Sequence, residues 1–436
     1  MPLFNNTNSG STVYSAAGYT LLPPNLGGPS LLRDWTTYQT LDHLVGPAIE
    51  FTRGSTATFT GSNGLIQSAA TNAPRFDYDP VTLACRGLLI EEQRTNLFLQ
   101  SEDFGTTWGA TAGMTRTPNA GISPDGTNDA WSIIPAASLG FWRLNQHTSV
   151  VPGTTYTMSV YAKANGYNFI RFESSYASGG VVAYFNLSNG SVSSVQGNAT
   201  ASITNVGNGW YRCSAAFIAT STGGAPSYFY PAPTGSAQNY TGDGTSGVLL
   251  WGAQLEAGSF PTSYIPTTTA TVTRSADVAQ ITGSNFTSFY NQSAGTLFAN
   301  ATPISNANNI IAPLCITTNP ASSNNFVQIR GTSFVWGANY RKTSVSSGDI
   351  YTSIATASGV SRKVATSFDF VGGSRSVCAS GGSVVTGTET NLFLNTMATL
   401  GVGYGQGGGN YLNGWLSSIA YYPSRLTDAQ LQALTA

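Results

Sequence analysis

Charged side chains are scarce in this chain. Only 8% of its 436 residues are Asp, Glu, Lys or Arg, whereas soluble globular domains usually carry about 25%. The formal net charge is −1, and Lys and Arg form no cluster along the sequence. Nucleic acids and anionic membrane surfaces attract proteins through concentrated positive charge. Neither is therefore an expected partner.

Metal ligands and long apolar runs are equally scarce. The chain has two histidines, His43 and His147, and four cysteines that form no CxxC pair, so a zinc site is not expected. No run of 18 apolar residues is present, which argues against membrane insertion. The start Met1–Asn5 lacks the basic and apolar stretches of a signal peptide. A polar, outward-type surface without a secretion signal fits a virus particle that is made in the bacterial cytoplasm and released by lysis.

Glycine and aromatic residues are abundant instead, with 49 Gly, 21 Tyr, 21 Phe and 8 Trp. Apolar residues alternate with polar ones in several short stretches that are separated by Gly-, Asn- and Pro-rich turns, and this period of two is typical of half-buried strands. The stretches are Tyr156–Ala162, Val181–Leu187, Tyr211–Ala219 and Leu249–Leu255. Short strands without long helices predict an antiparallel sandwich of the jelly-roll type.

One cysteine falls within this alternation. Cys213 is in phase with Tyr211, Ala215 and Phe217, so we expect it to be a free thiol in the core. A free buried thiol fits assembly in a reducing compartment. A disulfide stays open as the alternative.

A second β-rich block follows the Pro- and Thr-rich connector 261–273. Strands are expected at 295–302, 326–330, 333–338, 363–370, 374–380 and 412–421. A helix is expected at the C-terminus, because Thr427 and Gln430 form a capping box and Leu426 and Leu431 a hydrophobic staple. A second helix is plausible around 31–36. No repeat of 20–50 residues is visible, which disfavours a β-helix.

Four stretches within the first 108 residues resemble a module of tailed-bacteriophage and prophage structural proteins. They are Phe51–Thr58, Pro74–Pro80, Gly87–Leu97 and Ser101–Trp108. The resemblance implies a virion protein, and it leads us to expect an N-terminal attachment segment at 1–95 that contacts other virion proteins.

The middle block, 96–272, resembles jelly rolls of the carbohydrate-binding-module type. The stretches that carry this resemblance are Tyr156–Lys163, Gly209–Cys213, Leu250–Gly258 and Pro261–Pro266. It implies a structural calcium ion, for which Asp125–Asp129 could supply oxygen ligands. The acidic pair expected in the final strand is replaced by the uncharged run Leu250–Gln254. We therefore expect no cofactor, and a calcium ion stays open.

The last block, 273–436, resembles concanavalin- and laminin-G-type sandwiches. The resemblance lies in Leu412–Tyr422 and in the helix signal Ser424–Leu431 that follows it. The expected fold class is therefore mostly β: two antiparallel β-sandwiches of the jelly-roll type after an N-terminal virion-attachment segment.

Catalytic constellations are weak in the sequence. Glycosidases place two carboxyl groups across a cleft, but Glu91 and Glu92 are neighbours whose side chains point to opposite faces of a strand. Asp77 and Asp79 flank Tyr78 just before a proline, as turn residues do. A Ser-His-Asp triad needs a positioned histidine, and no GxSxG motif is present. We therefore do not expect an enzyme.

Aromatic residues are the remaining candidates for function, because sugar rings stack on exposed aromatic side chains. Those placed near predicted strand edges, together with charged residues on the same strand face and tyrosines near the glycine-rich loop 401–409, form the candidate carbohydrate-binding set. This set is Trp142, Tyr167, Phe169, Arg171, Glu173, Tyr176, Tyr404 and Tyr411. The competing interpretation is that these side chains fill the core or a subunit interface, since Trp and Tyr are buried on average.

The sequence as a whole leads us to expect a bacteriophage virion-surface protein, of the tail fibre or spike type, that adheres to host-surface glycans. Many copies would multiply weak contacts through avidity. We expect a homo-oligomer, with a trimer as the guess because fibres and spikes are often trimeric. One alternative is a capsid or tail decoration protein with a purely structural role. A polysaccharide depolymerase is the other, and it would require two carboxylates that face one cleft.

Overall fold

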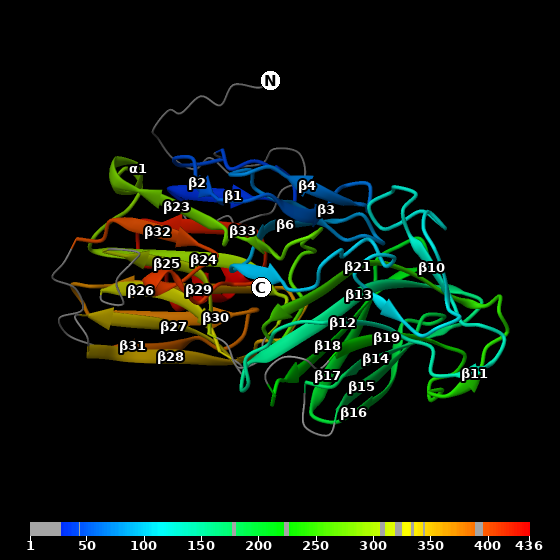
Figure 1. Cartoon of the computed structure of the whole chain (residues 1–436). Helices are drawn as coiled ribbons and strands as arrows, with labels where there is room; N and C mark the ends of the chain where they lie inside the picture. The colour runs from blue at the N-terminus through cyan, green and yellow to red at the C-terminus, as the bar shows by residue number, and fades with distance from the viewer. Residues whose placement is uncertain are drawn as a thin grey trace.

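A computed structural model shows two β-sandwiches that lie side by side (Figure 1). It describes residues 28–42, 44–176, 180–221, 226–305, 310–318, 325–332, 335–342, 345–388 and 396–436. His43 lies outside the described residues. The predicted class, mostly β with two antiparallel sandwiches, is confirmed. No helix in the described ranges is long and apolar enough to cross a membrane.

The first sandwich is built from two six-stranded sheets. One of them faces the second sandwich and is called the cleft sheet. Its strand order is β17 (Ala199–Asn205), β18 (Trp210–Ile218), β13 (Thr155–Asn165), β21 (Gly247–Ala257), β10 (Trp131–Ile134) and β9 (Thr115–Thr117). The outer sheet has the order β16 (Ser191–Gln196), β15 (Val181–Asn186), β14 (Phe169–Ser174), β19 (Pro226–Ala232), β12 (Leu144–His147) and β8 (Gly109–Ala110). A short ladder of β11 (Leu139–Gly140) and β20 (Tyr240–Thr241) lies at its end (Figure 1).

The alternation seen in the sequence places the expected apolar side chains between these sheets. Met158, Val160, Phe185 and Phe217 are all buried in one cluster. Cys213 belongs to the same cluster and is fully buried, and this burial raises the pKa of its thiol well above the ordinary value. All four cysteines are free, so the predicted buried thiol is confirmed.

The second sandwich combines strands from both ends of the chain. Its eight-stranded sheet contains β1 (Leu31–Asp34), β5 (Phe76–Tyr78), β6 (Cys85–Ile90), β24 (Ala294–Pro303), β29 (Arg362–Asp369), β30 (Ser374–Ala379), β31 (Val385–Thr388) and β33 (Gly414–Tyr422). Its seven-stranded sheet contains β2 (Glu50–Thr52), β23 (Val278–Thr282), β25 (Ile311–Thr317), β26 (Phe326–Gly331), β27 (Val335–Lys342), β28 (Val345–Ala355) and β32 (Thr399–Val402). The expected strands of the last block are therefore present. In the strand expected at 333–338, residues 333 and 334 lie outside the described residues.

The region before residue 96 differs from the predicted separate segment. Strand β33 pairs with β1 and β6 as well as with β24, and β2 pairs with β23. The reason is apolar burial: Leu31, Leu88 and Ile90 pack in one core with Leu416 and Ile419. The described part of 1–95 is thus an integral part of the second sandwich. A role in virion attachment stays a prediction.

Two local predictions had opposite outcomes. The helix expected around 31–36 is wrong, because Leu31–Asp34 is a strand of four residues paired with Tyr421–Ser418. The C-terminal helix is confirmed as α2 (Asp428–Thr435), with Thr427 and Gln430 in a complete capping box. The other helical elements among the described residues are short, namely α1 (Gly283–Thr287) and the single turn η1 (Gln406–Gly408).

A buried ionic cluster lies where the two sandwiches meet the connector. Arg75 binds Glu91 at 2.7 Å and also binds Asp277, while Arg53 binds Asp277 at 3.1 Å and Arg274 lies 3.5 Å from Glu91. None of the five side chains is more than 1% exposed. Three of them come from the stretches that resemble the phage module, so these stretches meet in space at one junction.

Two further ladders join this junction to the rest of the chain. Strands β3 (Ala57–Thr60) and β4 (Ile66–Ala69) form a hairpin. Strands β7 (Arg94–Asn96) and β22 (Val272–Arg274) pair at the point where the chain enters and leaves the first sandwich. Both crossings between the sandwiches therefore lie next to each other.

Candidate functional site

Three of the predicted aromatic candidates are core residues. Trp142, Tyr167 and Tyr176 are at most 8% exposed. The Trp142 indole donates a hydrogen bond to the carbonyl of Tyr240 at 3.2 Å, and the Tyr176 hydroxyl donates to the carbonyl of Thr148 at 2.6 Å. The core-filling interpretation describes these rings, and their assignment to an exposed sugar-stacking surface is corrected.

The two tyrosines near the glycine-rich loop are also packed against the protein. Tyr404 is 3% exposed, and its hydroxyl donates to the Oε1 atom of Gln280 at 3.0 Å. Tyr411 is half-buried and lies with its ring centroid 6.0 Å from that of Tyr404. Tyr404 is therefore corrected to a buried residue, and Tyr411 flanks it.

The remaining three predicted residues share one face of one strand. Phe169, Arg171 and Glu173 alternate along β14, on the side that points away from the core of the first sandwich. Arg171 and Glu173 form an ion pair at 2.7 Å. The structure thus brings these three together and separates them from the other five.

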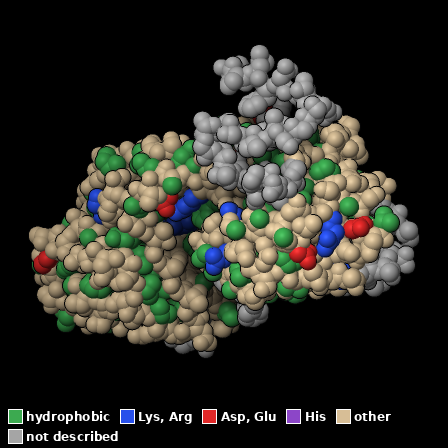
Figure 2. All heavy atoms as spheres, turned by 180° about the vertical axis from the view of Figure 1, so that it is seen from behind, with side chains coloured by type: hydrophobic (Ala, Val, Ile, Leu, Met, Phe, Trp, Pro, Cys, Tyr) green, Lys and Arg blue, Asp and Glu red, His purple; other side chains and the backbone are tan. Residues whose placement is uncertain are grey.

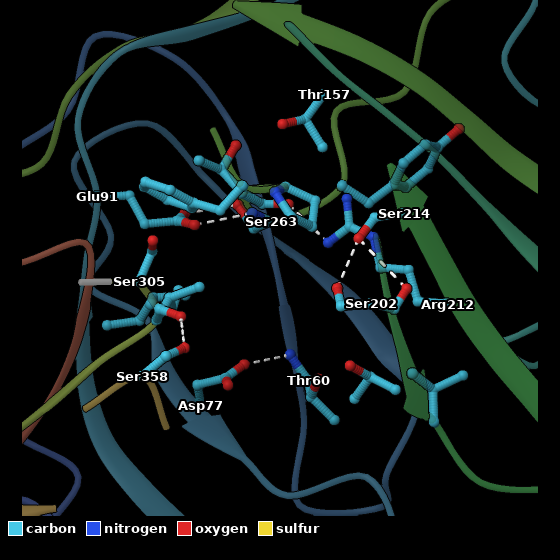
Figure 3. A pocket seen from close by; sticks show the side chains of 18 of the residues that line it. Thr60, Asp77, Glu91, Thr157, Ser202, Arg212, Ser214, Ser263, Ser305 and Ser358 are labelled. Atoms are coloured by element: carbon cyan, nitrogen blue, oxygen red, sulfur yellow. Dashed lines mark hydrogen bonds between the residues drawn. The ribbon is translucent and has the colours of Figure 1, made fainter. Parts of the chain in front are cut away.

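A cleft between the two sandwiches was not foreseen from the sequence. It has a volume of about 520 Å³ (Figure 3). From behind, the molecule shows two lobes with a hollow between them, and its surface is mostly uncharged (Figure 2). Side chains from both sandwiches and from the connector line the cleft. A cleft of this size with polar groups on several sides is a candidate binding site.

The floor of the cleft is the face of the cleft sheet that points away from the core of the first sandwich. Cross-strand register aligns its side chains in three rows over β17, β18 and β13. The rows are Thr200–Ala216–Thr157, Ser202–Ser214–Ser159 and Thr204–Arg212–Tyr161. Hydroxyl groups dominate because these residues are the polar half of the same period-two alternation that supplies the core. The polar positions of these alternating stretches are therefore the feature of the sequence that indicates the floor.

The wall opposite the floor is formed by the second sandwich. Asp77 on β5 accepts hydrogen bonds from the Trp415 indole at 2.8 Å and from the Thr60 backbone at 2.6 Å. The guanidinium of Arg86 lies 4.6 Å from the centroid of the Trp415 ring. Burial raises the pKa of Asp77 to about 6, although hydrogen bonding from Thr60 and the charge of Arg86 oppose the rise. This carboxyl group therefore titrates near neutral pH.

The connector closes one side of the cleft. Arg212 on the floor donates to the carbonyl of Thr262 at 2.6 Å and lies 5.3 Å from the ring of Tyr161. Ser263 donates through its backbone and its hydroxyl to Glu91, at 2.8 and 2.7 Å. The connector is thus hydrogen-bonded to Arg212 of the first sandwich and to Glu91 next to the second sandwich.

Asp77 and Glu91 line the same cleft, although their sequence positions did not pair them. Burial would raise the pKa of Glu91, but Arg274 and Arg75 outweigh it and lower this pKa to about 2. Carboxyl groups with pKa values driven apart are typical of acid and base pairs in catalysis. However, Glu91 is fully buried and both of its oxygens already accept hydrogen bonds from Ser263 or Arg75. Its Oε2 atom accepts from Arg75 and from the Ser263 hydroxyl, its Oε1 atom accepts from the Ser263 backbone, and its side chain has no exposed surface.

The stretch considered for calcium is occupied by internal hydrogen bonds. The Oδ1 atom of Asp125 accepts from Ser123 at 2.6 Å and from the backbone and hydroxyl of Thr127 at 2.9 and 2.7 Å, while Asp129 accepts from the Trp251 indole at 3.1 Å. Among the residues that the structure describes, no three His, Cys, Asp or Glu side chains gather closely enough to hold a metal ion. The Oδ1 atom of Asp129 is buried and has no hydrogen-bond partner among the described residues, so calcium binding at this stretch stays an open prediction.

Comparisons with known proteins give distant structural likeness. No protein-family profile matches the chain, and no curated protein matches it in sequence. Among solved structures, the carbohydrate-binding module of the Ruminococcus gnavus IT-sialidase bound to α2,3-sialyllactose is 19% identical, with a TM-score of 0.31 over 35% of this chain and 88% of that one. The leech intramolecular trans-sialidase is 17% identical, with a TM-score of 0.31 over 36% and 26%. A heptameric SAP-like pentraxin from Limulus polyphemus is 18% identical, with a TM-score of 0.25 over 33% and 71%.

Proposed function

We propose that this chain is a glycan-binding protein of a bacteriophage virion surface, and that the cleft between its sandwiches holds the glycan. The observation that carries the proposal is the hydroxyl-lined floor of a cavity of about 520 Å³. Pockets that hold small ligands measure about 300–1,000 Å³. The cleft therefore has room for a short saccharide.

The lining chemistry suits a ligand rich in hydroxyl groups. Each Ser or Thr hydroxyl both donates and accepts hydrogen bonds, so it can pair with a sugar hydroxyl in either role. Thr200, Ser202 and Thr204 on the edge strand β17 are exposed, and the Ser202 hydroxyl already shares a hydrogen bond with that of Ser214 at 2.7 Å. Trp415, which is half-buried beneath Arg86, adds an apolar surface on the opposite wall. Such contacts are individually weak, so several copies in a homo-oligomer, for which we propose a trimer, would supply avidity.

The virion location rests on the resemblance of Phe51–Thr58, Pro74–Pro80 and Gly87–Leu97 to phage structural proteins. Adhesion through a tail fibre or spike is the version we favour, because a decoration protein has no need of a polar cleft. Cryo-electron microscopy of the intact particle tests this part. Density at the tail supports adhesion, and density distributed over the capsid supports the decoration role.

Calorimetric titration of the purified full chain with fragments of host-surface polysaccharide tests the cleft. The test variant is Thr200→Val/Ser202→Ala/Thr204→Val. Each lost hydrogen bond costs about 0.5–1.5 kcal/mol, so we expect at least a tenfold loss of affinity. The matched control is Thr115→Val/Thr117→Val on β9, the opposite edge of the same sheet, and it should bind like the parent chain. Equal affinity in the test variant would place the glycan elsewhere.

The same fragments also test whether the cleft only binds. We expect no release of reducing ends during prolonged incubation, because the Glu91 side chain has no exposed surface and is already bound by Arg75 and Ser263. Release that disappears in Asp77→Asn would replace binding by hydrolysis as the function of the cleft.

A further inference from the structure

A second polar cluster lies on the outer sheet, on the side of the first sandwich away from the cleft. Arg171 on β14 is paired in register with Tyr184 on β15 and with Tyr230 on β19. Its guanidinium lies 4.2 Å from the ring centroid of Tyr230 and 5.8 Å from that of Tyr184. The cation is thus held between two aromatic rings on a rigid sheet.

Hydrogen bonds extend this cluster over three strands. Glu173 binds Arg171 at 2.7 Å and accepts from the Tyr230 hydroxyl at 2.5 Å. Arg143, which immediately precedes β12, lies 3.5 Å from the same hydroxyl. The Tyr230 hydroxyl therefore links Arg143 to the Arg171–Glu173 pair, and the two arginines and one glutamate together carry an excess positive charge.

Arg171 is also incompletely paired. It is 2% exposed, yet its Nε and Nη1 atoms have no hydrogen-bond partner. Every other described arginine with a buried, unpartnered nitrogen lacks a partner only at Nε. Leaving a buried donor unmatched is costly, and a buried charge is normally paired. Two nitrogen atoms of this buried cation therefore lack an acceptor.

Several side chains next to the buried Arg171 are partly exposed to solvent. Tyr228 and Asn145 are half-buried and lie opposite each other on β19 and β12. The guanidinium of Arg143 lies 4.5 Å from the Tyr228 ring centroid, and the side chain of Glu173 is 22% exposed. An aromatic ring, an amide and a cation thus surround the opening to the cluster.

We propose that this face, defined by Arg143, Arg171, Glu173, Tyr228 and Tyr230, is a second saccharide site and that it takes an acidic saccharide. The carboxylate of the sugar pairs with Arg143 and is attracted by the buried positive charge of Arg171, while Tyr228 and Asn145 contact the ring. Carboxylates and guanidinium groups form strong, geometrically matched hydrogen bonds. This site is independent of the cleft, because the two sites lie on opposite sheets of the first sandwich.

Titration of the full chain with trigalacturonate and with its fully methyl-esterified form tests the proposal without any mutation. The two ligands have the same rings and differ in charge. We expect trigalacturonate to bind at least tenfold more tightly, and its affinity to fall as salt rises. No saturable binding of trigalacturonate, or equal affinity for the ester, overturns the proposal.

Two variants locate the site. Arg143→Gln removes the half-buried cation and should weaken trigalacturonate binding at least tenfold. Arg362→Gln, which removes a half-buried cation from β29 in the second sandwich, is the matched control and should bind like the parent chain. The β17 triple variant should also retain trigalacturonate binding, so failure of the cleft and failure of this site are distinguishable. Unchanged affinity in Arg143→Gln overturns the proposal.

Discussion

Replacement of Arg75 by methionine tests the buried ionic cluster. Arg75 binds Glu91 and Asp277, and it also donates to the carbonyl of Thr58 and the hydroxyl of Ser263, at 2.9 and 2.8 Å. Removing one partner of a buried ion pair costs about 3–5 kcal/mol, because the other charge stays buried without compensation. Here two carboxylates lose a partner, although Arg53 and Arg274 stay nearby. We therefore expect Arg75→Met to lower the free energy of unfolding by at least about 3 kcal/mol.

Urea denaturation, followed by tryptophan fluorescence, measures this loss. The matched control is Arg425→Gln, which removes an ion pair with Asp428 whose side chains are 28% and 46% exposed. Exposed pairs contribute about 0–1 kcal/mol, so the control should stay close to the parent chain. The triple variant Arg75→Met/Glu91→Gln/Asp277→Asn leaves Arg53 and Arg274 buried without their carboxylate partners, so it should be no more stable than Arg75→Met. A cost for Arg75→Met no larger than that of the control would refute the reasoning.

Three further predictions concern pH and local geometry. The folded-state pKa of Glu91 is lowered from 4.5 to about 2, so its contribution to stability is complete above pH 4.5 and is lost as the pH falls towards 2; in acid denaturation Glu91→Gln should lack this loss. The pKa of Asp77 is raised from 3.8 to about 6, so the parent chain should gain stability between pH 7 and pH 4 relative to Asp77→Asn, and parallel pH profiles would contradict this. Gly87 has a φ of 109°, and a Cβ there would lie 2.1 Å from the carbonyl oxygen of Leu416, so Gly87→Ala should lower the midpoint of thermal unfolding; Gly409→Ala, with no atom within 4 Å, is the control and should not.

The core of the first sandwich could be predicted because its signal is local. A period of two over six or more residues determines which side chains face inward, and Met158, Cys213 and Phe217 are buried as expected. The same holds for helix α2, since the capping box lies within four residues of sequence. Neither prediction depends on which other element the strand or helix packs against.

The second sandwich shows where local signals end. Leu31–Asp34 becomes a strand because β33, almost 400 positions later, offers a partner edge, and tertiary context overrides weak helix preference. The cleft was missed for the same reason. Thr204 on its floor and Trp415 on its wall belong to different sandwiches, and an exposed polar strand face indicates only solvent until the opposite wall is known.

The phage-like stretches also have a structural meaning that bears on their function. Arg53, Arg75 and Glu91 carry part of that resemblance, yet their side chains have no exposed surface, so they cannot contact another protein directly. Arg75 instead donates a hydrogen bond to the carbonyl of Thr58, and Glu91 accepts one from the backbone of Ser263. Both Thr58 and Ser263 line the cleft. The junction therefore connects the wall of the cleft to its floor. Loss of the ionic cluster should then weaken glycan binding in the cleft while trigalacturonate binding on the outer sheet stays unchanged, because Arg171, Tyr230 and their neighbours lie on the other sheet of the first sandwich.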